Sequence, residues 1–351
     1  MIQENFMNER QQAILGFIKH KQITSRQEIQ DVIALHFNKV SRITIIRDLD
    51  ILEQDGKIKK IGTGRTTRYE FFATPLLEVI DTDEYFAKDQ DRRNLVSDYF
   101  NFNIWNKLQG LLTDKEKIDL ALMNETYLES RAKMSPSLIK KEVERVTIEL
   151  SWKSSQIEGN TYTLLDTEQL IKSGVEAKEK THREAVMILN HKRAIDYIFA
   201  KPEFFIQLKL RDIEDLHRML STELDVTLGI RSHRVGITGT KYRPLDNSYQ
   251  IKEALEQLIK TLNTTKNPIE RAMIAVLMIS YIQPFEDGNK RTSRILGNAL
   301  LLAANYCPLS YRSVNEEEYK KAILLFYEQN SAYYFKQIFI EQFKFAVDNY
   351  F

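Results

Sequence analysis

The feature that most constrains the fold is a nearly unbroken apolar run over residues 272–282, which ends just before Pro284. A segment that is apolar on all sides predicts a buried helix, and proline ends it because proline cannot continue a helix. The Asp-Gly-Asn triplet at 287–289 predicts a turn, and residues 292–304 predict a second helix. The sequence therefore predicts a tight helix–loop–helix, with the loop at the N-terminus of the second helix.

This loop gathers groups that bind phosphate. The free N–H groups and the dipole of a helix N-terminus form an anion site. Lys290, Arg291 and Arg294 are expected to bring three positive charges to the same place, and arginine can grip phosphate oxygens with two hydrogen bonds at once. Asp287, a lone carboxylate among these cations, is expected to hold Mg²⁺ between phosphates, and Phe285 to plug the core. The alternative is a surface turn held by salt bridges. It would explain a single cluster of basic residues, but it explains the complete run of loop residues less well.

The rest of the chain is predicted to be mostly helical. Its 351 residues include only 12 glycines and 7 prolines, and apolar residues recur mostly at helical spacing. One strand-like segment, Val235 to Tyr242, interrupts the helices of the C-terminal part. We expect a compact unit over residues 1–75, an acidic and aromatic helical connector over 76–135, and a main domain over 136–351.

The unit over residues 1–75 is predicted to hold three helices and two strands. Helices are expected over residues 8–20, from Ser25 and from Ser41, and strands over 57–61 and 66–71. Glu28 stands three residues after Ser25 and makes a capping box with it. The third helix is expected to bury the apolar residues Ile43, Ile45, Ile46, Leu49, Ile51 and Leu52.

This arrangement resembles a winged helix-turn-helix, which implies that the third helix enters the DNA major groove and that the hairpin contacts the DNA backbone. Residues 1–75 carry 12 Lys and Arg against 9 Asp and Glu, a net charge of +3, and the cations concentrate on the last two elements. A winged helix that docks another protein or a partner subunit is the alternative. The predicted DNA-binding residues are Arg42, Thr44, Arg47, Lys59, Lys60, Arg65 and Arg68, with Lys57 beside them on the hairpin.

Residues 283–294 resemble the motif of the Fic family, His-Pro-Phe-x-Asp/Glu-Gly-Asn-Gly-Arg-x-x-Arg, and the resemblance extends over roughly residues 80–345. It implies a mainly helical Fic fold with a short β-hairpin flap. It also implies that the domain binds ATP and Mg²⁺, with Asp287 at the metal, and transfers AMP to a hydroxyl of a protein target. The matched positions are Pro284, Phe285, Asp287, Gly288, Asn289, Arg291 and Arg294. The nucleotide-binding residues that it implies are Gly288, Asn289, Lys290, Arg291 and Arg294.

Two further segments are similar to parts of Fic proteins. Arg231 and residues 235–244, with Gly239 and Tyr242, resemble the flap, a hairpin that pairs with an extended piece of the target protein. Ser154 and Glu158, on a helix expected over about 136–158, match the inhibitory motif (Ser/Thr)-x-x-x-Glu-(Gly/Asn). The resemblance implies that Glu158 pairs with Arg294, so that this arginine cannot hold the γ-phosphate of ATP. A plain carboxylate at a helix end is the alternative.

Two positions depart from the family. Gln283 stands where the family has its catalytic histidine, and an amide cannot accept the proton of an attacking hydroxyl as imidazole can near neutral pH. Asp287 or the substrate phosphate could serve as the base instead. Lys290 stands where AMP-transferring members have glycine, and it resembles the Doc branch, which transfers a phosphate. A lysine at this position would crowd one phosphate subsite and add a charge.

These patterns favour an ATP-binding regulator with a DNA-binding unit, whose AMP transfer is weakened or lost. The alternatives are an active, autoinhibited adenylyltransferase that modifies Ser, Thr or Tyr of itself or a partner, a Doc-like phosphotransferase, and a purely structural Fic domain. The overall charge, 50 Lys and Arg against 49 Asp and Glu, predicts no partner. One cysteine, the lack of a signal-peptide pattern and the lack of a bilayer-spanning run favour a cytoplasmic protein. A homodimer is expected, since Fic proteins often pair through helical surfaces.

Overall fold

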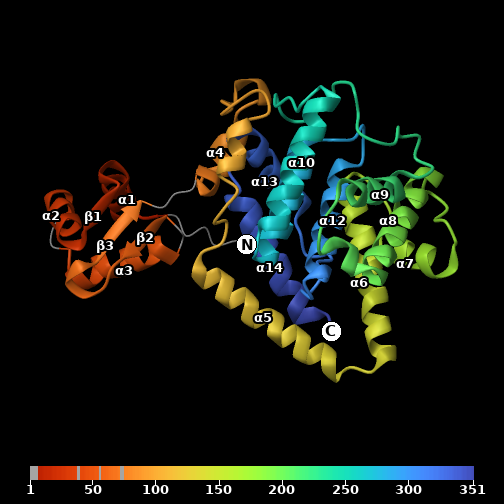
Figure 1. Cartoon of the computed structure of the whole chain (residues 1–351), viewed down its shortest axis with the longest axis horizontal. Coiled ribbons are helices and arrows are strands. Elements are labelled where there is room, and N and C mark those ends of the chain that lie inside the picture. Colours follow the sequence, from red (N-terminus) through yellow and green to blue (C-terminus); the bar gives the residue numbers. More distant parts are fainter. Residues whose placement is uncertain (1–6, 38–39, 55–56, 72–74) are drawn as a thin grey trace. The chain divides into compact units, whose positions relative to one another are not determined.

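The chain divides into two compact units (Figure 1), and a computed structural model describes residues 7–37, 40–54, 57–71 and 75–351. The first unit consists of Met1–Glu78 with Gln109–Ile118, and the second of Val79–Leu108 with Asp119–Phe351. Residues of the expected connector therefore belong to both units.

The first unit contains three helices and a three-stranded antiparallel sheet in which β3 lies between β1 and β2. The elements are α1 (Glu9–Lys21), β1 (Ile23–Ser25), α2 (Arg26–His36), α3 (Arg42–Gln54), β2 (Ile58–Ile61) and β3 (Arg68–Phe71), with short 3₁₀ turns at Gly64–Thr66 and Pro75–Leu77. The three helices and the two later strands confirm the sequence prediction. The pattern does not predict β1, which has only three residues and pairs Thr24 with Tyr69.

A capping box begins α2. The Glu28 carboxylate accepts hydrogen bonds from the N–H and the hydroxyl of Ser25, as the spacing predicts. These bonds favour the ionised carboxylate and lower the pKa of Glu28 to about 2. The box fixes the point at which the chain leaves β1 and enters the helix.

The apolar face of α3 is narrower than its sequence suggests. Ile45, Leu49 and Leu52 are buried in the core of the first unit. The prediction was wrong for Ile43 and Ile51, which are 64% and 37% exposed. Both lie away from the buried face, at least about 100° around the helix from each of the three buried residues, because an α-helix turns once every 3.6 residues.

The second unit is built almost entirely of helices, as predicted. It contains α4 (Thr82–Ala87), most of α5 (Asp114–Lys133), α6 (Pro136–Ile157), α7 (Leu164–Ser173), α8 (His182–Ala200), α9 (Leu210–Ser221), α10 (Ser248–Thr264), α11 (Pro268–Ile282), α12 (Asn289–Ala303), α13 (Glu316–Gln329) and α14 (Tyr333–Asn349). Short 3₁₀ turns occur at Gln90–Arg92, Phe102–Asn106 and Pro202–Phe205. Among the helices that the structure describes, none is long and apolar enough to cross a membrane.

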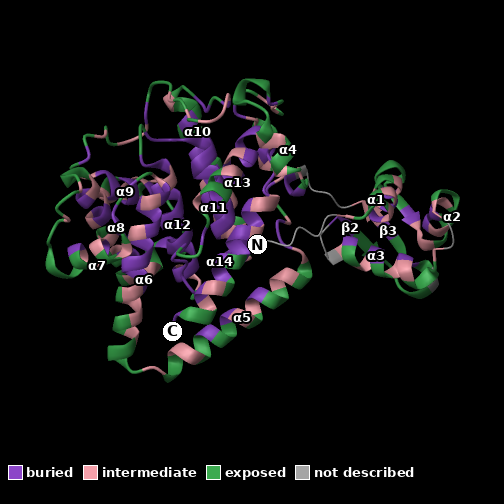
Figure 2. Ribbon diagram, turned by 180° about the vertical axis from the view of Figure 1, so that it is seen from behind, coloured by how far each residue is buried: buried purple, intermediate pink, exposed green. Residues whose placement is uncertain are grey.

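α11 lies in the core of the second unit (Figure 2). Every residue from Ala272 to Ile282 is buried, as the apolar run predicts, and α12 packs along this helix. Gly297 permits the close approach, because a Cβ atom there would lie 2.8 Å from Cγ2 of Val276. Close packing on both sides fixes the loop that joins the two helices.

Two predictions about this unit were wrong. α12 begins at Asn289, three residues before the expected start at Thr292, because Gly288 adopts a φ of 78° and caps the helix. Residues 235–242 form no strand. Within the described residues, the flap takes part in one isolated β-bridge, a parallel one between Arg243 and Tyr99. The flap is therefore an extended loop whose two arms do not pair with each other.

Candidate nucleotide-binding site

The loop between α11 and α12 is braced from inside the protein. Phe285 is fully buried, as predicted, and its ring stacks on His217 with the centroids 3.7 Å apart and the planes 7° from parallel. The Asn289 side chain accepts a hydrogen bond from the N–H of Phe285 and donates one to its carbonyl. These contacts fix the backbone of the loop without any help from a ligand.

The cations of the site stand at the beginning of α12. Lys290 and Arg291 lie in its first turn, where N–H groups have no partner within the helix and attract an anion. Arg294 follows one turn later and is fully buried, whereas the Lys290 side chain is 34% exposed. A buried cation is stable only with fixed partners, so the partners of Arg294 define the site.

The partners of Arg294 come from α6 and its C-terminal end. Its Nη2 lies 2.9 Å from Oε1 of Glu158 and 2.8 Å from the Ser154 carbonyl, and its Nε donates to the Ser154 hydroxyl at 2.9 Å. Lys290 Nζ lies 3.7 Å from the other carboxylate oxygen of Glu158. Burial by itself would raise the pKa of Glu158, but Arg294 and Lys290 outweigh it and hold this pKa below its ordinary value. Glu158 is therefore ionised and shared by two cations.

A buried histidine orients this pair. Nε2 of His191 lies 2.9 Å from the Ser154 hydroxyl, and Nδ1 lies 2.9 Å from the Met187 carbonyl. Burial lowers the pKa of His191 to about 3, so its ring is neutral. Nδ1 must donate to the carbonyl, and Nε2 accepts from the Ser154 hydroxyl, which leaves the Ser154 oxygen to accept from Arg294. Sequence reasoning missed His191, since nothing in its local pattern links it to Ser154.

Arg291 has different partners. Its Nη2 lies 3.0 Å from Oδ2 of Asp287, and its Nη1 lies 3.4 Å from the Leu220 carbonyl. Of the three cations expected at one place, the structure brings Lys290 and Arg294 to Glu158, whereas Arg291 pairs with Asp287. The reason is position in the loop, because Asp287 comes directly before the N-cap residue Gly288 and lies beside the first turn of the helix, where Arg291 stands.

Asp287 can take part in binding Mg²⁺ only together with a nucleotide. Its side chain is 57% exposed, and its Oδ1 accepts a hydrogen bond from the Gly288 N–H at 2.6 Å. Within the described residues, no group of three or more His, Cys, Asp or Glu lies close enough to hold a metal alone. Mg²⁺ in nucleotide sites commonly takes one or two carboxylates and completes its shell with phosphates and water. One exposed carboxylate beside a helix N-terminus fits that pattern.

A cavity of about 330 Å³ opens beside the Glu158 pair. Its charged lining residues are Glu158, Lys290 and Lys320, and Ile237 and Thr238 of the flap line it as well. Tyr319, Ile323, Leu324 and Tyr327 of α13 supply much of the apolar and aromatic remainder. A mainly apolar pocket with a few charged groups suits a base and its phosphates.

Gln283 occupies the C-terminal end of α11 in an unusual backbone conformation. Its φ is 50° and its ψ is 59°, in the left-handed region that few residues other than glycine adopt. The side-chain Nε2 donates to the Ser280 carbonyl at 2.6 Å and lies 3.4 Å from the Tyr327 hydroxyl. Gln283 is 7% exposed, and its neutral amide offers no base near neutral pH.

One arginine ties the flap to this position. The guanidinium of Arg231, which is buried, donates to the carbonyls of Gln283, His233 and Leu245. His233 and Leu245 stand at the two ends of the flap, so a single side chain holds both ends beside Gln283. The sequence indicates Arg231 only as part of the flap, because its three acceptors are backbone atoms and leave no residue pattern.

The two predicted flap residues have distinct environments. Tyr242 is buried, its hydroxyl donates to the Tyr281 carbonyl at 2.9 Å, and the two rings stack with centroids 4.6 Å apart. Gly239 adopts a φ of 88°, which would strain any other residue. Tyr242 thus anchors the end of the flap, and Gly239 permits its turn.

The predicted DNA-binding residues of the first unit lie on α3 and on the sheet. Arg42 and Arg47 are exposed on α3. The Thr44 hydroxyl and N–H lie within hydrogen-bonding distance of the Ser41 hydroxyl, which they help to fix at the start of the helix. Lys60 on β2 and Arg68 on β3 are exposed as well.

The remaining predicted cations of this unit do not all stand on its exposed surface as free side chains. Lys59 lines a cavity of about 400 Å³ together with Asp50, Glu53 and Asp114, all in the same unit. The expectation that Lys57 faces outward was wrong, since it is only 8% exposed. The Arg65 side chain lies outside the described part of the structure.

Comparisons with known proteins point to the same site. Residues 207–301 match the Fic/DOC family. The proteins named protein adenylyltransferase Fic from Drosophila melanogaster and Drosophila sechellia are each 33% identical over 156 residues, which is 44% of this chain and 32% of theirs. The chain thus spans about a third of the length of these curated relatives.

Solved structures show the fold. Fic-1 from C. elegans aligns with a TM-score of 0.56 and 21% identity over 67% of this chain and 70% of that chain. A Fic domain containing signaling protein from Bacteroides thetaiotaomicron aligns with a TM-score of 0.56 and 18% identity, over 66% and 94% of the two chains. The second unit therefore has the Fic fold. Residues 207–301 therefore form a Fic/DOC family domain, which is homologous to Fic adenylyltransferases.

Proposed function

We propose that this protein is a regulator whose Fic domain binds Mg²⁺–ATP and whose adenylyl transfer is held off by Glu158. The observation that carries the proposal is the 2.9 Å ion pair between Glu158 and the fully buried Arg294, beside a cavity of about 330 Å³. A phosphate can take the bidentate grip of Arg294 only if it replaces the carboxylate. ATP that binds with the pair in place therefore lacks this contact.

Transfer is also weakened at Gln283. In adenylyl transfer, a hydroxyl oxygen of the target forms a bond to the α-phosphorus, the bond to pyrophosphate breaks, and the hydroxyl proton must go to an acceptor. The Gln283 amide can hydrogen-bond the hydroxyl but cannot take its proton. The loss of a general base typically costs on the order of 10²–10⁴ in rate. Positioning and charge neutralisation remain, so a low activity is compatible with the site.

Two alternatives keep an enzymatic role. In the first, the domain is an active adenylyltransferase that modifies a hydroxyl of itself or of a partner once Glu158 withdraws, with Asp287 or a phosphate oxygen as the proton acceptor. In the second, Lys290 reflects a Doc-like reaction that transfers the γ-phosphate. The flexible ammonium of Lys290 lines the cavity, which favours extra phosphate contacts in either case.

The first unit is the DNA-binding part of the proposal. Its order of helix, strand, helix, helix, strand, strand is that of a winged helix-turn-helix. The exposed cations on α3, β2 and β3 support contacts to phosphates. A homodimer would present two such units to two half-sites. Docking of another protein on the same face is the alternative, and a salt titration with DNA distinguishes the two.

Four proteins test the nucleotide proposal: the unchanged chain, Glu158→Gly, Gln283→His and the double variant. Each is incubated with Mg²⁺ and ATP labelled on either the α- or the γ-phosphate, and ATP binding is measured by calorimetry. We expect the unchanged chain to bind ATP, and α-label to appear well above background only in the double variant. Strong α-label with Glu158→Gly alone would establish the first alternative, and γ-label the second. If the chain does not bind ATP at all, the proposal is wrong.

A further inference from the structure

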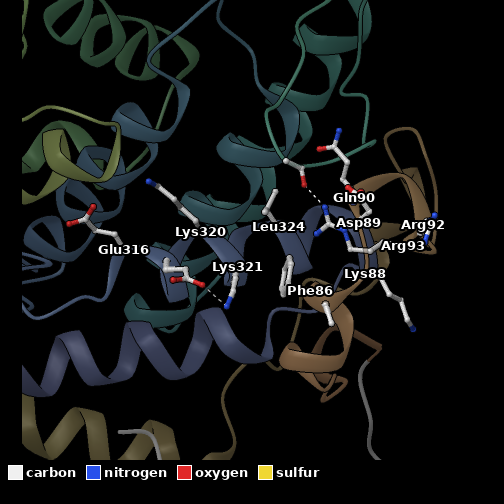
Figure 3. Close-up of a pocket in the computed structure, with 13 residues that line it drawn as sticks. Phe86, Lys88, Asp89, Gln90, Arg92, Arg93, Glu316, Lys320, Lys321 and Leu324 are labelled. Atoms are coloured by element: carbon white, nitrogen blue, oxygen red, sulfur yellow. Dashed lines mark hydrogen bonds and ion pairs between the residues drawn. The ribbon is translucent and has the colours of Figure 1, made fainter.

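A second, larger hollow lies next to the nucleotide cavity. This hollow, which we call the basic groove, has a volume of about 870 Å³ and lies between residues 86–93 and the first turns of α13. Figure 3 shows Lys320, Lys321 and Glu316 arising from α13, and Lys88, Arg92 and Arg93 from the segment that follows α4, with Phe86 and Leu324 between them. The groove therefore has charged side chains on both flanks and two apolar side chains between them.

The basic groove and the nucleotide cavity adjoin each other along the flap. Lys320 and Leu324 line both hollows. Ile237 and Thr238 of the flap line the cavity, and the next residue, Gly239, lines the groove. A chain segment that lies in the groove would therefore pass the turn of the flap and end beside the nucleotide cavity.

The shape of the groove is built into the core. Arg93 is only 4% exposed, lies 3.4 Å from the buried Glu328 and donates to the Gly239 carbonyl. Its guanidinium also lies over the Phe86 ring, 5.1 Å from the centroid. Tyr85 donates to the other oxygen of Glu328 at 2.7 Å. A single buried arginine thus holds the segment after α4, the flap and α13 in fixed positions.

Most of the charges that remain available in the groove are positive, and the exposed Asp89 is the exception. The carboxylates of its α13 flank are engaged, because Glu316 pairs with Lys153 at 3.1 Å and Glu317 with Lys321 at 2.7 Å. Arg92 and Lys320 are exposed and form no ion pair with the described residues. Lys88 makes only a 3.5 Å surface contact with Glu84, and such exposed pairs contribute little.

We propose that the basic groove docks an acidic, extended segment of the protein on which the Fic domain acts. The proposal rests on the proposed function, since it names the kind of target. Acidic side chains would pair with Arg92, Lys88 and Lys320, and an apolar side chain would cover Phe86 and Leu324. Attraction between these cations and the acidic side chains guides the approach of the segment and fixes its position along the groove, as charged groups at the rim of an interface commonly do.

The mixed composition of the groove favours a peptide over a nucleic acid. Asp89 lines it together with the cations and forms no ion pair with the described residues, and a phosphodiester backbone with a charge at every nucleotide would meet repulsion from this carboxylate. A peptide can place its carboxylates opposite the cations alone.

The test measures peptide binding to the whole 351-residue chain without nucleotide. The probe is a fluorescein-labelled peptide of 12 residues (about 40 Å when extended) with four Asp or Glu, one Leu and one Tyr among Gly and Ser. A matched peptide replaces the acids by Asn and Gln, and a single-stranded oligonucleotide of similar length is the third ligand. The groove variant is Lys88→Glu/Arg92→Glu. The control variant is Lys252→Glu/Lys260→Glu, which makes the same change in charge on exposed positions of α10 that do not line the groove.

We expect the acidic peptide to bind at least tenfold more tightly than the neutral one, and the groove variant to lose about tenfold of that affinity. The control variant should change it by less than twofold. Calorimetry with ATP should give the same affinity for the groove variant as for the unchanged chain, so a failure of peptide docking is distinct from a failure of nucleotide binding. Equal affinity for the two peptides, an unaffected groove variant, or an oligonucleotide that displaces the peptide from the groove would each overturn the proposal.

Discussion

The two units of this protein use positive charge in opposite ways. In the first unit, Arg42, Arg47, Lys60 and Arg68 project from α3 and the sheet into solvent. In the second unit, Arg294 is fully buried and has fixed oxygen partners. The difference lies in desolvation, because an exposed cation keeps its water until a ligand arrives, whereas a buried one must be paired at all times.

Under the proposed function, one unit is regulated from within and the other is not. A phosphate would have to compete with Glu158 for the buried Arg294. DNA phosphates would compete only with salt for Arg42, Arg47, Lys60 and Arg68, which form no ion pair with the described residues. Four measurements can break or sharpen this contrast.

Removal of one carboxylate should lower the free energy of unfolding far more in the buried ion pair than in an exposed ion pair. Glu158→Gln leaves Arg294 buried with no charge beside it except the repelling Lys290, so we expect the free energy of unfolding of the second unit to fall by about 3 kcal/mol. Trp105 and Trp152 both lie in the second unit, so tryptophan fluorescence in a denaturant titration reports on it alone.

The matched control is Glu84→Gln, which removes the exposed partner of Lys88. We expect a change below about 0.5 kcal/mol. Equal effects of the two substitutions would show that the Glu158 pair is no more than a surface contact.

Acid should destabilise the second unit through its buried histidines. Burial lowers the pKa of His191 to about 3 and that of His217 to about 4, whereas an unfolded histidine titrates near 6.5. At pH values between the folded and the unfolded pKa, the unfolded chain binds more protons than the folded chain. The two histidines therefore contribute their full share of the free energy of unfolding only above about pH 6.5. Each histidine should remove up to about 1.4 kcal/mol per pH unit as the pH falls toward 4.

The substitution that checks this assignment is His191→Gln, whose amide can keep the hydrogen bond to Ser154. It should flatten the pH dependence of unfolding followed by tryptophan fluorescence. His36→Gln, at an exposed position of the first unit, serves as the control and should leave the dependence unchanged. If the free energy of unfolding of His191→Gln falls with pH as steeply as that of the unchanged chain, His191 is not the source of the pH dependence.

Some of these features follow from sequence and others do not. Local chemistry predicts the capping box of Ser25 and Glu28, and the length of the apolar run predicts α11. The link between Glu158 and Arg294 is visible because each half belongs to a motif. His191 and Arg93 escape prediction, since they act on groups that are remote in sequence. Arg231 is indicated only as part of the flap, and its role as an anchor escapes prediction because it donates to carbonyls, which every residue carries.

The salt dependence of DNA binding tests the exposed face. If Arg42 and Arg47 neutralise phosphates, Arg42→Gln/Arg47→Gln should reduce the slope of log K against log salt by about 1.8, or about 0.9 for each contact. Fluorescence anisotropy with a duplex of about 20 base pairs measures it. Lys252→Gln/Lys260→Gln, on α10 of the second unit, should leave the slope unchanged. A flat salt response of the unchanged chain would favour protein docking by the first unit.

The central claim is that Glu158 occupies the place of a γ-phosphate on Arg294, and the ratio of ATP to ADP affinity tests it most directly. With Glu158 in place, the γ-phosphate gains no grip from Arg294, so calorimetry with Mg²⁺ should give similar affinities for the two nucleotides. Glu158→Gly should make ATP bind at least tenfold more tightly than ADP, because a charge-assisted hydrogen bond contributes about 1.5–3 kcal/mol. An unchanged ratio in Glu158→Gly, or a strong preference for ATP in the unchanged chain, would contradict the account.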